Sequence, residues 1–328
     1  MKINCCPSCL KTGYETFCNP CQKKLFNGKK VSHILTFSKP FYEQTVIEKG
    51  GKISISGVQP KHSLRLNGNI LELTEEGGEY ILKPCPTAIM ENVEQLPANE
   101  HLTMQIASQL FKMSVAKNAL LFFKDSYEPC YLTKRFDRKS DGTKLNVEDF
   151  TQIAGKTEEN DGIEYKYKLS YEEIAEILKD NCSAYPIEVE KFFKAIIFNY
   201  LINNGDAHMK NFSMLRNDSY KDYLLSPQYD LLNTRIHFPK DTEIALDLFK
   251  KGYATDSFKT NAHFLYQDFF EFGIKIGVKE NRVKKFLSAI ISKYNEIEDL
   301  TQRSFLNEDT KKLYLEYVRL SIKKLSPI

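Results

Sequence analysis

Residues 198–230 have the sequence FNYLINNGDAHMKNFSMLRNDSYKDYLLSPQYD, and they decide how the rest of the chain is interpreted. Asp206 is followed five residues later by Asn211, and Asp230 lies a further nineteen residues along the chain. These residue types in this order suit phosphoryl transfer, because the first Asp can deprotonate a hydroxyl while the other two side chains bind Mg²⁺ on nucleotide phosphates. The Asp-x4-Asn spacing is that of a kinase catalytic loop. The alternative is a set of ordinary solvated loop residues.

The residues on either side predict the elements that hold these side chains. Apolar residues between 189 and 201 recur at helical spacing, and Asn203-Asn204-Gly205 then ends the helix. Two short apolar segments, 212–215 and 223–225, predict a hairpin whose second strand leads into Asp230. Both acidic side chains are therefore expected at the ends of rigid elements, where active sites are usually built.

The composition is that of an ordinary globular protein, with 42% hydrophobic and 27% charged residues in a chain of 328. This length is sufficient for two domains or for one bilobal domain. The net charge of +3 is too small to indicate nucleic-acid binding by the whole chain. However, residues 1–61 hold ten lysines and three acidic residues, a balance of +7. This basic segment predicts either a surface that faces an acidic partner, RNA or DNA, or a plain solvated surface.

Neither a membrane span nor a leader sequence is indicated. No apolar run reaches the roughly 18 residues that a membrane span needs. The first residues, MKINCCPSC, lack the apolar core of a signal peptide. We therefore expect no membrane contact and a cytoplasmic, reducing setting, in which the eight cysteines do not form disulfides.

Five of the eight cysteines lie in the first 30 residues. Cys6 and Cys9 form one C-x-x-C pair, and Cys18 and Cys21 form a second. Each pair puts two thiolates on one tight turn, and two pairs complete a tetrahedral Zn²⁺ site without an open position, which indicates a structural role. Because so short a segment buries little core, a bound metal would stabilise it. Cys5 could replace Cys6 as a ligand, and reduced thiols without metal are the alternative.

Residues 44–83 predict the strands of a β-rich lobe, because apolar and polar residues alternate in short runs. The expected strands are 44–48, 52–61, 63–66, 70–73 and 79–83. Residues 54–61 are a candidate phosphate-binding loop, since Gly57, two hydroxyls and Lys61 accompany backbone N–H groups that can face phosphate. An ordinary strand and turn is the alternative. Lys83 ends an apolar strand and is placed either to reach nucleotide phosphates or simply to be solvated.

A helix is predicted over residues 97–117, with Glu100 in its first turn. Glu100 could pair with Lys83, as kinases pair a strand lysine with a helix glutamate, or it could simply stabilise the helix N-terminus. A hairpin is expected over residues 119–133. The chain then crosses between lobes, and we place that boundary within residues 133–145.

From residue 147 the pattern predicts mainly helices. Ser170 and Glu173 form a capping box that opens one of them. Beyond Asp230, residues 244–246 predict a short strand. The rest of the chain predicts three packing helices, and these are expected near residues 260–276, 279–296 and 307–324.

Taken together, these motifs resemble those of the HipA-type serine/threonine kinases of bacterial toxin–antitoxin systems. The matching segments run in family order between about residues 44 and 325. They are SISGVQPK at 54–61 for the Gly-rich loop, YILK at 80–83 for the ATP-binding strand, TKRFDR at 133–138 for the hinge, NGDAHMKN at 204–211 for the catalytic loop and SPQYDL at 226–231 for the metal-binding motif. The resemblance implies an α+β, bilobal protein-kinase-like fold. Its expected parts are a Cys-rich module at 1–35, a β-rich N-lobe at 36–138 and a helical C-lobe at 139–328.

The resemblance also implies roles for individual residues. Asp206 would be the catalytic base, supported near the γ-phosphate by His208 and Lys210. Asn211 and Asp230 would hold Mg²⁺. The residues implied in ATP binding are Ser54, Ser56, Gly57, Val58, Gln59, Lys61, Lys83, Lys134 and Phe136.

Family members inactivate themselves by phosphorylating a serine of the Gly-rich loop. A phosphate adds about −1.5 to −2 charges, so the modified loop cannot stay beside the ATP phosphates. Ser54 aligns best with that serine, and Ser56 is a second candidate. Family members also have a separate N-terminal subdomain before this loop, whereas only residues 1–53, with the cysteine cluster, precede it here.

The resemblance further implies partners. They are a host protein substrate, with aminoacyl-tRNA synthetases as the family's known targets, a HipB-like DNA-binding antitoxin, and a separate small protein equivalent to the missing subdomain. DNA would be reached only through the antitoxin. Two other functions remain open: a small-molecule phosphotransferase of the aminoglycoside type, and a non-catalytic pseudokinase or DNA-associated scaffold. The hinge and the Gly-rich loop disfavour the first, and the complete set of catalytic residue types disfavours the second.

Overall fold

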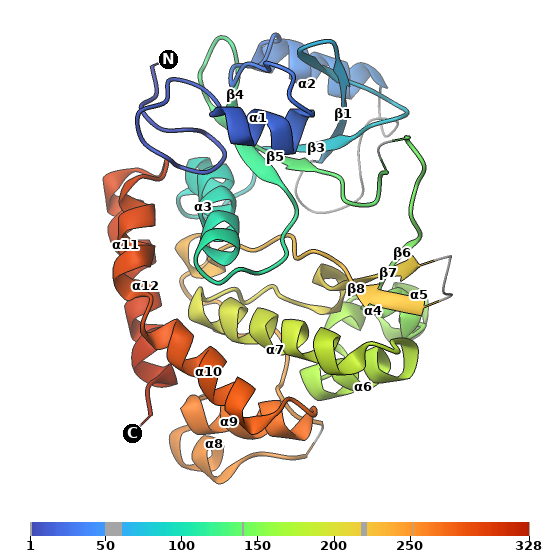
Figure 1. The fold of residues 1–328 in the computed structure, drawn as a ribbon, viewed down its shortest axis with the longest axis vertical. Helices are drawn as coiled ribbons and strands as arrows, with labels where there is room; N and C mark the ends of the chain where they lie inside the picture. The colour runs from blue at the N-terminus through green and yellow to red at the C-terminus, as the bar shows by residue number, and fades with distance from the viewer. Residues whose placement is uncertain (1, 50–60, 140, 218–221, 251, 328) are drawn as a thin grey trace.

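The structure, a computed structural model, describes residues 2–49, 61–139, 141–217, 222–250 and 252–327. Figure 1 shows a β-rich part that contains the N-terminus and a larger helical part that contains the C-terminus. Helix α3 (Leu96–Gln109) lies directly below the β-rich part in this view. Among the described helices, none is both long enough and apolar enough to cross a lipid bilayer.

A five-stranded antiparallel sheet forms the β-rich part, in the order β2-β1-β3-β5-β4. Its strands are β1 (His62–Asn67), β2 (Ile70–Leu73), β3 (Tyr80–Pro84), β4 (Asn118–Phe122) and β5 (Pro129–Lys134). The hairpin predicted at residues 119–133 is present as β4 and β5, and the register sets Lys83 opposite Tyr131. Successive residues point to opposite faces, so Tyr131 joins the core that contains α3 while Leu132 joins the core on the other face.

Helices α1 (Asn19–Phe26) and α2 (Lys39–Lys49) contribute to the core on the face of the sheet away from α3. The prediction of a strand at 44–48 is wrong, because this segment lies within α2. Tyr42 packs on Phe123 with ring centroids 5.5 Å apart and its hydroxyl lies 2.8 Å from His62 Nδ1. Burial of this helical face overrides the strand propensity of the β-branched residues. The strand expected at 52–61 falls, except for its last residue, outside the described residues.

Helix α3 ends at Gln109, well before the predicted end at residue 117. Lys112 has a φ of 52°, which turns the chain out of the helix. The next residues then lie beside Gln228, which accepts a hydrogen bond from Ala116 N at 2.9 Å and donates one to Ser114 O at 2.8 Å. The chain after α3 is therefore bound to the segment that leads into Asp230.

A small three-stranded sheet, in the order β6-β7-β8, lies in the larger part. Its strands are β6 (Val147–Asp149), β7 (Ser213–Asn217) and β8 (Asp222–Leu225). The hairpin predicted after Asp206 is thus present, but β6 lies where the sequence predicted helix. A strand of three residues is too short for its alternation to be recognised, and Asp149 then caps the next helix through a capping box.

The helices that precede the small hairpin agree with the sequence. They are α4 (Phe150–Ile153), α5 (Glu158–Asp161), α6 (Tyr171–Asn181) and α7 (Tyr185–Leu201). Ser170 and Glu173 form the predicted capping box at the start of α6. Helix α7 crosses the middle of the larger part (Figure 1), and its apolar side chains fill the main core. Single 3₁₀ turns are η2 (Val93–Gln95), η3 (Tyr165–Tyr167), η4 (Met209–Asn211) and η5 (Thr234–Ile236).

The described C-terminal residues form five helices where the sequence predicted three. They are α8 (Asp256–Asn261), α9 (Tyr266–Lys275), α10 (Glu280–Ile291), α11 (Tyr294–Gln302) and α12 (Glu308–Leu325). The first two predicted helices are each divided, one at Ala262, whose φ is 57°. The strand predicted at 244–246 is also wrong. The carbonyls just after it, of Asp247 and Leu248, accept the N–H groups of Tyr171 and Glu172, so this segment caps α6 instead.

Candidate active site

Lys83, Glu100 and Asp230 meet between strand β3, helix α3 and the segment that follows β8. Lys83 Nζ lies 2.6 Å from Glu100 Oε1 and also contacts one carboxylate oxygen of Asp230. Lys61 Nζ lies 3.4 Å from the other Asp230 oxygen. Lys83 is 4% exposed and Glu100 is 2% exposed. The pairing that the sequence suggested is present, and a buried cation joins two carboxylates from distant parts of the chain.

The charges of this cluster shift one another's pKa values. Burial acts to lower the pKa of Lys83, but the carboxylates of Asp230 and Glu100 outweigh it and raise that pKa. Burial acts to raise the pKa of Asp230, but Lys83 and Lys61 hold it well below its usual range. Burial raises the pKa of Glu100 to about 7, because Lys83 offsets it only in part and Asp230 adds repulsion. Asp230 is therefore ionised at neutral pH, as a ligand for a divalent cation must be.

The raised pKa of Glu100 predicts a pH-dependent stability. The folded protein holds this proton up to about pH 7, whereas the unfolded chain releases it near its ordinary value of 4.5. The free energy of unfolding should therefore fall as the pH rises from about 4.5 to about 7, and this contribution should be constant above that range. Urea unfolding of the wild type and Glu100→Gln between pH 4.5 and 8 measures the effect. Equal pH slopes for the two proteins would contradict it.

Asp206 lies in a loop that follows α7, and the chain turns out of the helix at Asn203, whose φ is 55°. Buried Asn204 links this loop to the metal-binding motif. Its Oδ1 accepts from Asp206 N at 3.3 Å, and its Nδ2 donates to Asp230 O at 3.4 Å. Asn211 Nδ2 donates to Asp206 O at 2.7 Å, which leaves Oδ1 as the atom of that amide suited to a metal. The loop and Asp230 are thus fixed to each other.

Gly205 allows the loop to pass close to a neighbouring segment. A Cβ atom at this position would lie 2.4 Å from Asp241 Oδ2 and 2.5 Å from Thr242 O. The Gly205 N–H also donates to Thr234 Oγ1 at 2.9 Å. A side chain at this residue would therefore displace the backbone that positions Asp206.

The Asp206 carboxylate faces solvent and three polar side chains. Tyr167 donates its hydroxyl to Asp206 Oδ1 at 2.7 Å, and His208 Nε2 and Lys166 Nζ lie 3.5 and 3.8 Å from the same oxygen. The Asp206 side chain is 51% exposed. Beside it is a groove of about 510 Å³, whose lining includes Tyr167, Lys166 and Gly205. The carboxylate is therefore both oriented and accessible to a substrate hydroxyl.

His208 and Lys210, which the sequence assigned to the same loop, differ in their surroundings. His208 is buried, and burial lowers the pKa of its imidazole. Its ring packs edge-on against Tyr167, with centroids 5.2 Å apart. Lys210 Nζ instead reaches out to Tyr165 Oη at 3.1 Å. Tyr165 and Tyr167 both belong to η3, so this turn packs against one side of the loop that carries His208 and Lys210.

The predicted hinge residues also lie apart from each other. Phe136 stacks on Tyr229, next to Asp230, with ring centroids 5.7 Å apart and an interplanar angle of 28°. Lys134 Nζ donates to Leu25 O and Asn27 Oδ1, both at 3.1 Å, at the end of α1. Phe136 therefore borders the metal-binding motif, whereas the Lys134 side chain is engaged with α1. The adenine-binding roles of these two residues stay predictions.

Most of the predicted Gly-rich loop, including Ser54, Ser56, Gly57, Val58 and Gln59, lies outside the described residues. The last residue of that loop is described, and it makes the contact with Asp230 given above. A larger concavity of about 960 Å³ lies between α2, β2 and the β4–β5 turn, and no candidate site residue that the structure describes is among its lining residues.

Sequence reasoning missed two residues that organise the site. Asn204 was interpreted only as part of a helix stop and of the catalytic-loop match, and nothing in the local sequence indicates that its buried amide joins Asp206 to Asp230. Tyr167 was assigned no role from the sequence, and its contact with Asp206 crosses 39 residues of sequence. Such a contact depends on where η3 packs, which local patterns do not reveal.

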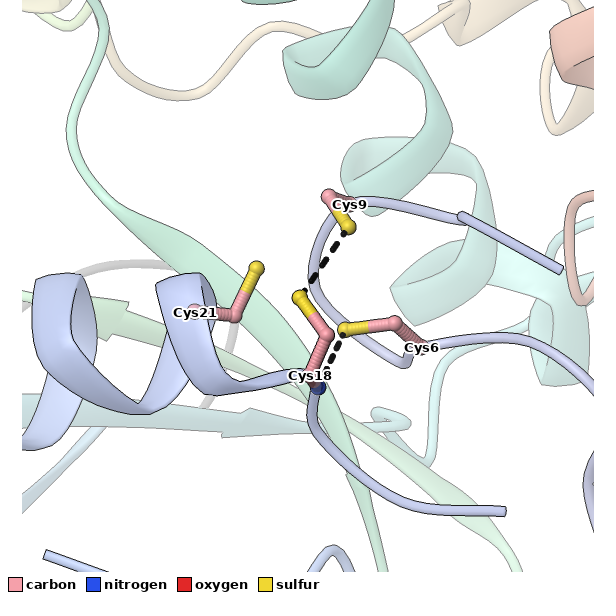
Figure 2. A group of neighbouring side chains, drawn as sticks. All are labelled: Cys6, Cys9, Cys18 and Cys21. Carbon is pink, nitrogen blue, oxygen red and sulfur yellow. Dashed lines mark hydrogen bonds between the residues drawn. The ribbon is translucent and has the colours of Figure 1, made fainter. Parts of the chain in front are cut away.

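The four predicted zinc ligands form a second cluster of neighbouring side chains (Figure 2). The sulfur atoms of Cys6, Cys9, Cys18 and Cys21 all lie within 4.8 Å of one another, and none is in a disulfide. Cys9 and Cys18 Sγ are 3.7 Å apart. Zn–S bonds of about 2.3 Å in a tetrahedron separate the sulfurs by roughly 3.8 Å, so this spacing fits zinc.

The geometry favours Cys6 over Cys5 as the ligand. Cys18 N donates to Cys6 Sγ at 3.3 Å, an interaction that suits a thiolate. Hydrogen bonds from the Cys21 and Cys9 thiols hold the pKa of Cys6 well below its usual range. Cys5 points away instead, since its thiol donates to Arg303 O at 3.4 Å and burial raises its pKa to about 11.

Comparison with known proteins places the chain in a family. Residues 53–297 match the family described as HipA-like C-terminal domain. The chain belongs to this family. This HipA-like chain is 30% identical over 301 residues to a Haemophilus influenzae protein named "Putative kinase", covering 86% of this chain and 84% of that protein. It is 26% identical over 233 residues to the serine/threonine-protein kinase toxin HipA of Shewanella oneidensis, covering 66% of this chain and 50% of the toxin.

Two solved structures share the fold of the HipA-like chain. HipA of Shewanella oneidensis, solved with HipB and operator DNA, matches 88% of this chain and 70% of its own with a TM-score of 0.62 and 22% identity. The Helicobacter pylori proinflammatory kinase CtkA matches 80% of this chain and 90% of its own with a TM-score of 0.53 and 17% identity. At these identities the comparison concerns the fold alone, and it confirms the predicted bilobal kinase-like architecture.

Proposed function

We propose that this HipA-like protein is an ATP- and Mg²⁺-dependent serine/threonine protein kinase that acts as a toxin. The observation that carries the proposal is one continuous cluster. Lys83 binds both Glu100 and Asp230, and Asn204 ties Asp230 to the loop of Asp206. Protein kinases need the lysine–glutamate pair and the metal-binding aspartate in place together. Family membership and relatives that are named as kinases support the same activity.

In this proposal each described side chain has one task. Asp206 accepts the proton of a substrate hydroxyl, with Tyr167 fixing the carboxylate oxygen that it contacts. Lys83 binds nucleotide phosphate, and Glu100 holds the ammonium group in position. Asn211 and Asp230 would hold Mg²⁺, which neutralises phosphate charge when bound.

The groove beside Asp206 resembles a binding site for a protein segment more than an enclosed site for a small molecule. It is formed by short segments of the larger part, and its lining contains Ile163, Glu164, Lys166, Asp241 and Thr242. This mixture of apolar, acidic and basic groups, with Asp206 half exposed beside it, suits a polypeptide hydroxyl as acceptor. We propose a cytoplasmic host protein as the substrate.

The proposal also includes a partner protein and the autophosphorylation that would inactivate the kinase. HipA of Shewanella oneidensis was solved with HipB and operator DNA. By analogy we propose a HipB-like antitoxin as the partner of this protein, with DNA contacted through that antitoxin and with a separate small protein as a second partner. Ser54 or Ser56 is the proposed autophosphorylation site, because a phosphate there would oppose the ATP phosphates.

A comparison of phosphoproteins tests the function. Cells that express the wild-type chain should stop growing and should gain phosphoserine or phosphothreonine on at least one host protein. Cells that express Asp206→Ala at the same level should show neither change. Purified wild type with ATP and Mg²⁺ should also gain the mass of one or two phosphates. Growth arrest by both proteins, with no new phosphopeptide, would contradict the kinase assignment.

We further propose that the four cysteines bind structural zinc. Because four sulfur ligands close the coordination sphere, the metal would stabilise the fold and would not itself bind the nucleotide or the substrate. We expect about one Zn²⁺ per chain in purified protein. Cys21→Ser should lose most of it, whereas Cys5→Ser, which changes a neighbouring cysteine outside the cluster, should retain it. Elemental analysis of the three proteins decides, and a wild type well below one zinc per chain would count against the site.

A further inference from the structure

The loop that carries Cys6 and Cys9 packs directly on α3, the helix that carries Glu100. His101 Nε2 lies 2.9 Å from Ser8 O, and because a carbonyl only accepts, this nitrogen is the donor. Gln109 Nε2 donates to Cys9 O at 2.9 Å. His101 is 0% exposed and follows Glu100 directly in the chain. Backbone carbonyls from inside the first cysteine pair thus bind α3 beside the ion pair and again at its C-terminal end.

The same loop is also bound to the sheet and to the C-terminal helices. Ser8 Oγ donates to Asn118 O at 2.9 Å, and Leu120 N donates to Pro7 O at 2.8 Å, which joins the loop to β4. Arg303 Nη1 donates to Leu10 O at 3.1 Å, just beyond α11. Figure 1 shows the N-terminal segment beside α3 and the top of α11. The loop, residues 6–10, is therefore a wedge between α3, which carries Glu100, β4 and the end of α11.

This loop needs an external constraint to keep its shape. Leu10 is 0% exposed and has a φ of 59°, a region that side chains other than glycine seldom adopt. Such a conformation persists only where the surroundings hold it. The second cysteine pair, Cys18 and Cys21 at the start of α1, lies within sulfur-ligand distance of the first pair. A metal bound to all four would join α1 to the wedge.

We propose that the cysteine site sets the position of α3, so that zinc held by the four sulfurs keeps Glu100 against Lys83, with His101 and Gln109 as the positioning residues. Kinase activity requires this ion pair, and displacement of its helix is a general means of control. The inference rests on the proposed kinase function. It adds that phosphoryl transfer depends on metal bound away from the nucleotide site.

Other contacts limit how far α3 can move. Asn99 Nδ2 donates to Asn233 O at 2.8 Å, and Thr103 Oγ1 lies 2.9 Å from Tyr314 Oη. These bonds hold α3 to the larger part even without the wedge. Loss of zinc should therefore shift or loosen the helix rather than unfold it, and the expected loss of activity is about tenfold, the effect of one or two hydrogen bonds.

Hydrogen exchange and kinetics together test the inference. The wild type is stripped of zinc with a chelator and compared with the zinc-loaded protein and with Cys9→Ser. Cys182→Ser, which changes a buried cysteine at the end of α6, is the matched control. Amides of residues 96–109 should exchange about tenfold faster in both zinc-free proteins, and phosphoryl transfer should fall about tenfold and return when zinc is added to the stripped wild type. Unchanged exchange of this helix without zinc would overturn the inference.

Two further variants keep all four sulfurs and break only the contacts with α3. His101→Leu and Gln109→Leu should each retain zinc. In the double variant, kcat should fall about tenfold and the amides of α3 should exchange faster. Full kcat and full α3 protection in the double variant would overturn the inference, even if Cys9→Ser failed to fold. If the zinc-loaded wild type transferred no phosphate at all, the proposed function would fail, while the exchange experiment would still decide whether zinc positions α3.

Discussion

Replacement of Asp206 by alanine is expected to lower the rate of phosphoryl transfer about 10²–10⁴-fold, the range for loss of a positioned general base. Its side chain is half exposed and its Oδ1 accepts the Tyr167 hydroxyl, so the change removes little packing. The free energy of unfolding should stay within about 0.5 kcal/mol of the wild type. The affinity for ATP should change little, because Lys83, Asn211 and Asp230 are untouched.

Single-turnover kinetics with purified protein and a titration with a nucleotide analogue measure these two quantities separately. Asp309→Ala is a suitable control, since it removes a carboxylate that is 95% exposed on α12, far along the chain from the site. This control should match the wild type in both measurements. An Asp206→Ala protein that retained more than about a tenth of the wild-type rate would show that another group accepts the proton.

Replacement of Lys83 by methionine should damage both stability and activity. The ammonium group is buried between Glu100 and Asp230, so its loss leaves two carboxylates without their shared partner. Breaking a buried ion pair in this way costs about 3–5 kcal/mol of unfolding free energy. Nucleotide affinity should fall at least about tenfold, and phosphoryl transfer should be lost, because the lysine is one of the groups that position phosphate.

A double variant separates repulsion from lost packing. Lys83→Met with Glu100→Gln removes one of the two opposed carboxylates, so it should recover part of the stability lost in the single variant. Activity should not return, because the ammonium group is still absent. Lys124→Met, a change of an exposed lysine after β4, should be neutral. Urea unfolding at pH 8 compares the four proteins, and a double variant no more stable than Lys83→Met would contradict the repulsion.

The parts of the site that follow one another in sequence could be predicted from it. Asp206 and Asn211 share one loop, and their spacing is fixed by a turn of η4 between helix and hairpin. The two cysteine pairs likewise have a local geometry, so the sequence could indicate the cluster, although not whether Cys5 or Cys6 joins it. The pairing of Lys83 with Glu100 could also be predicted from the sequence, because a strand and the helix that follows it commonly pack together.

The parts that depend on tertiary packing could not be predicted in this way. Residues 44–48 have strand propensity, yet burial of Tyr42 makes them helical. Residues 147–149 form strand β6 because they pair with the edge of β7. The sequence of these three residues alone does not indicate this pairing. The choice between Cys5 and Cys6 depends on Arg303, whose carbonyl binds the Cys5 thiol from the other end of the chain.

That last contact has a consequence for how the protein is made. Arg303 is hydrogen-bonded to Leu10 across 293 positions of sequence and to Cys5 across 298. Contacts of such separation form late, after the elements synthesised first have already condensed. On the ribosome, the first ten residues can bind α3 and β4 as soon as these elements have emerged, but their contacts with Arg303 must wait until α11 has been made. A nascent chain interrupted before residue 303 would therefore hold the wedge from one side only, without the contact that fixes Cys5 and Leu10 from the C-terminal side.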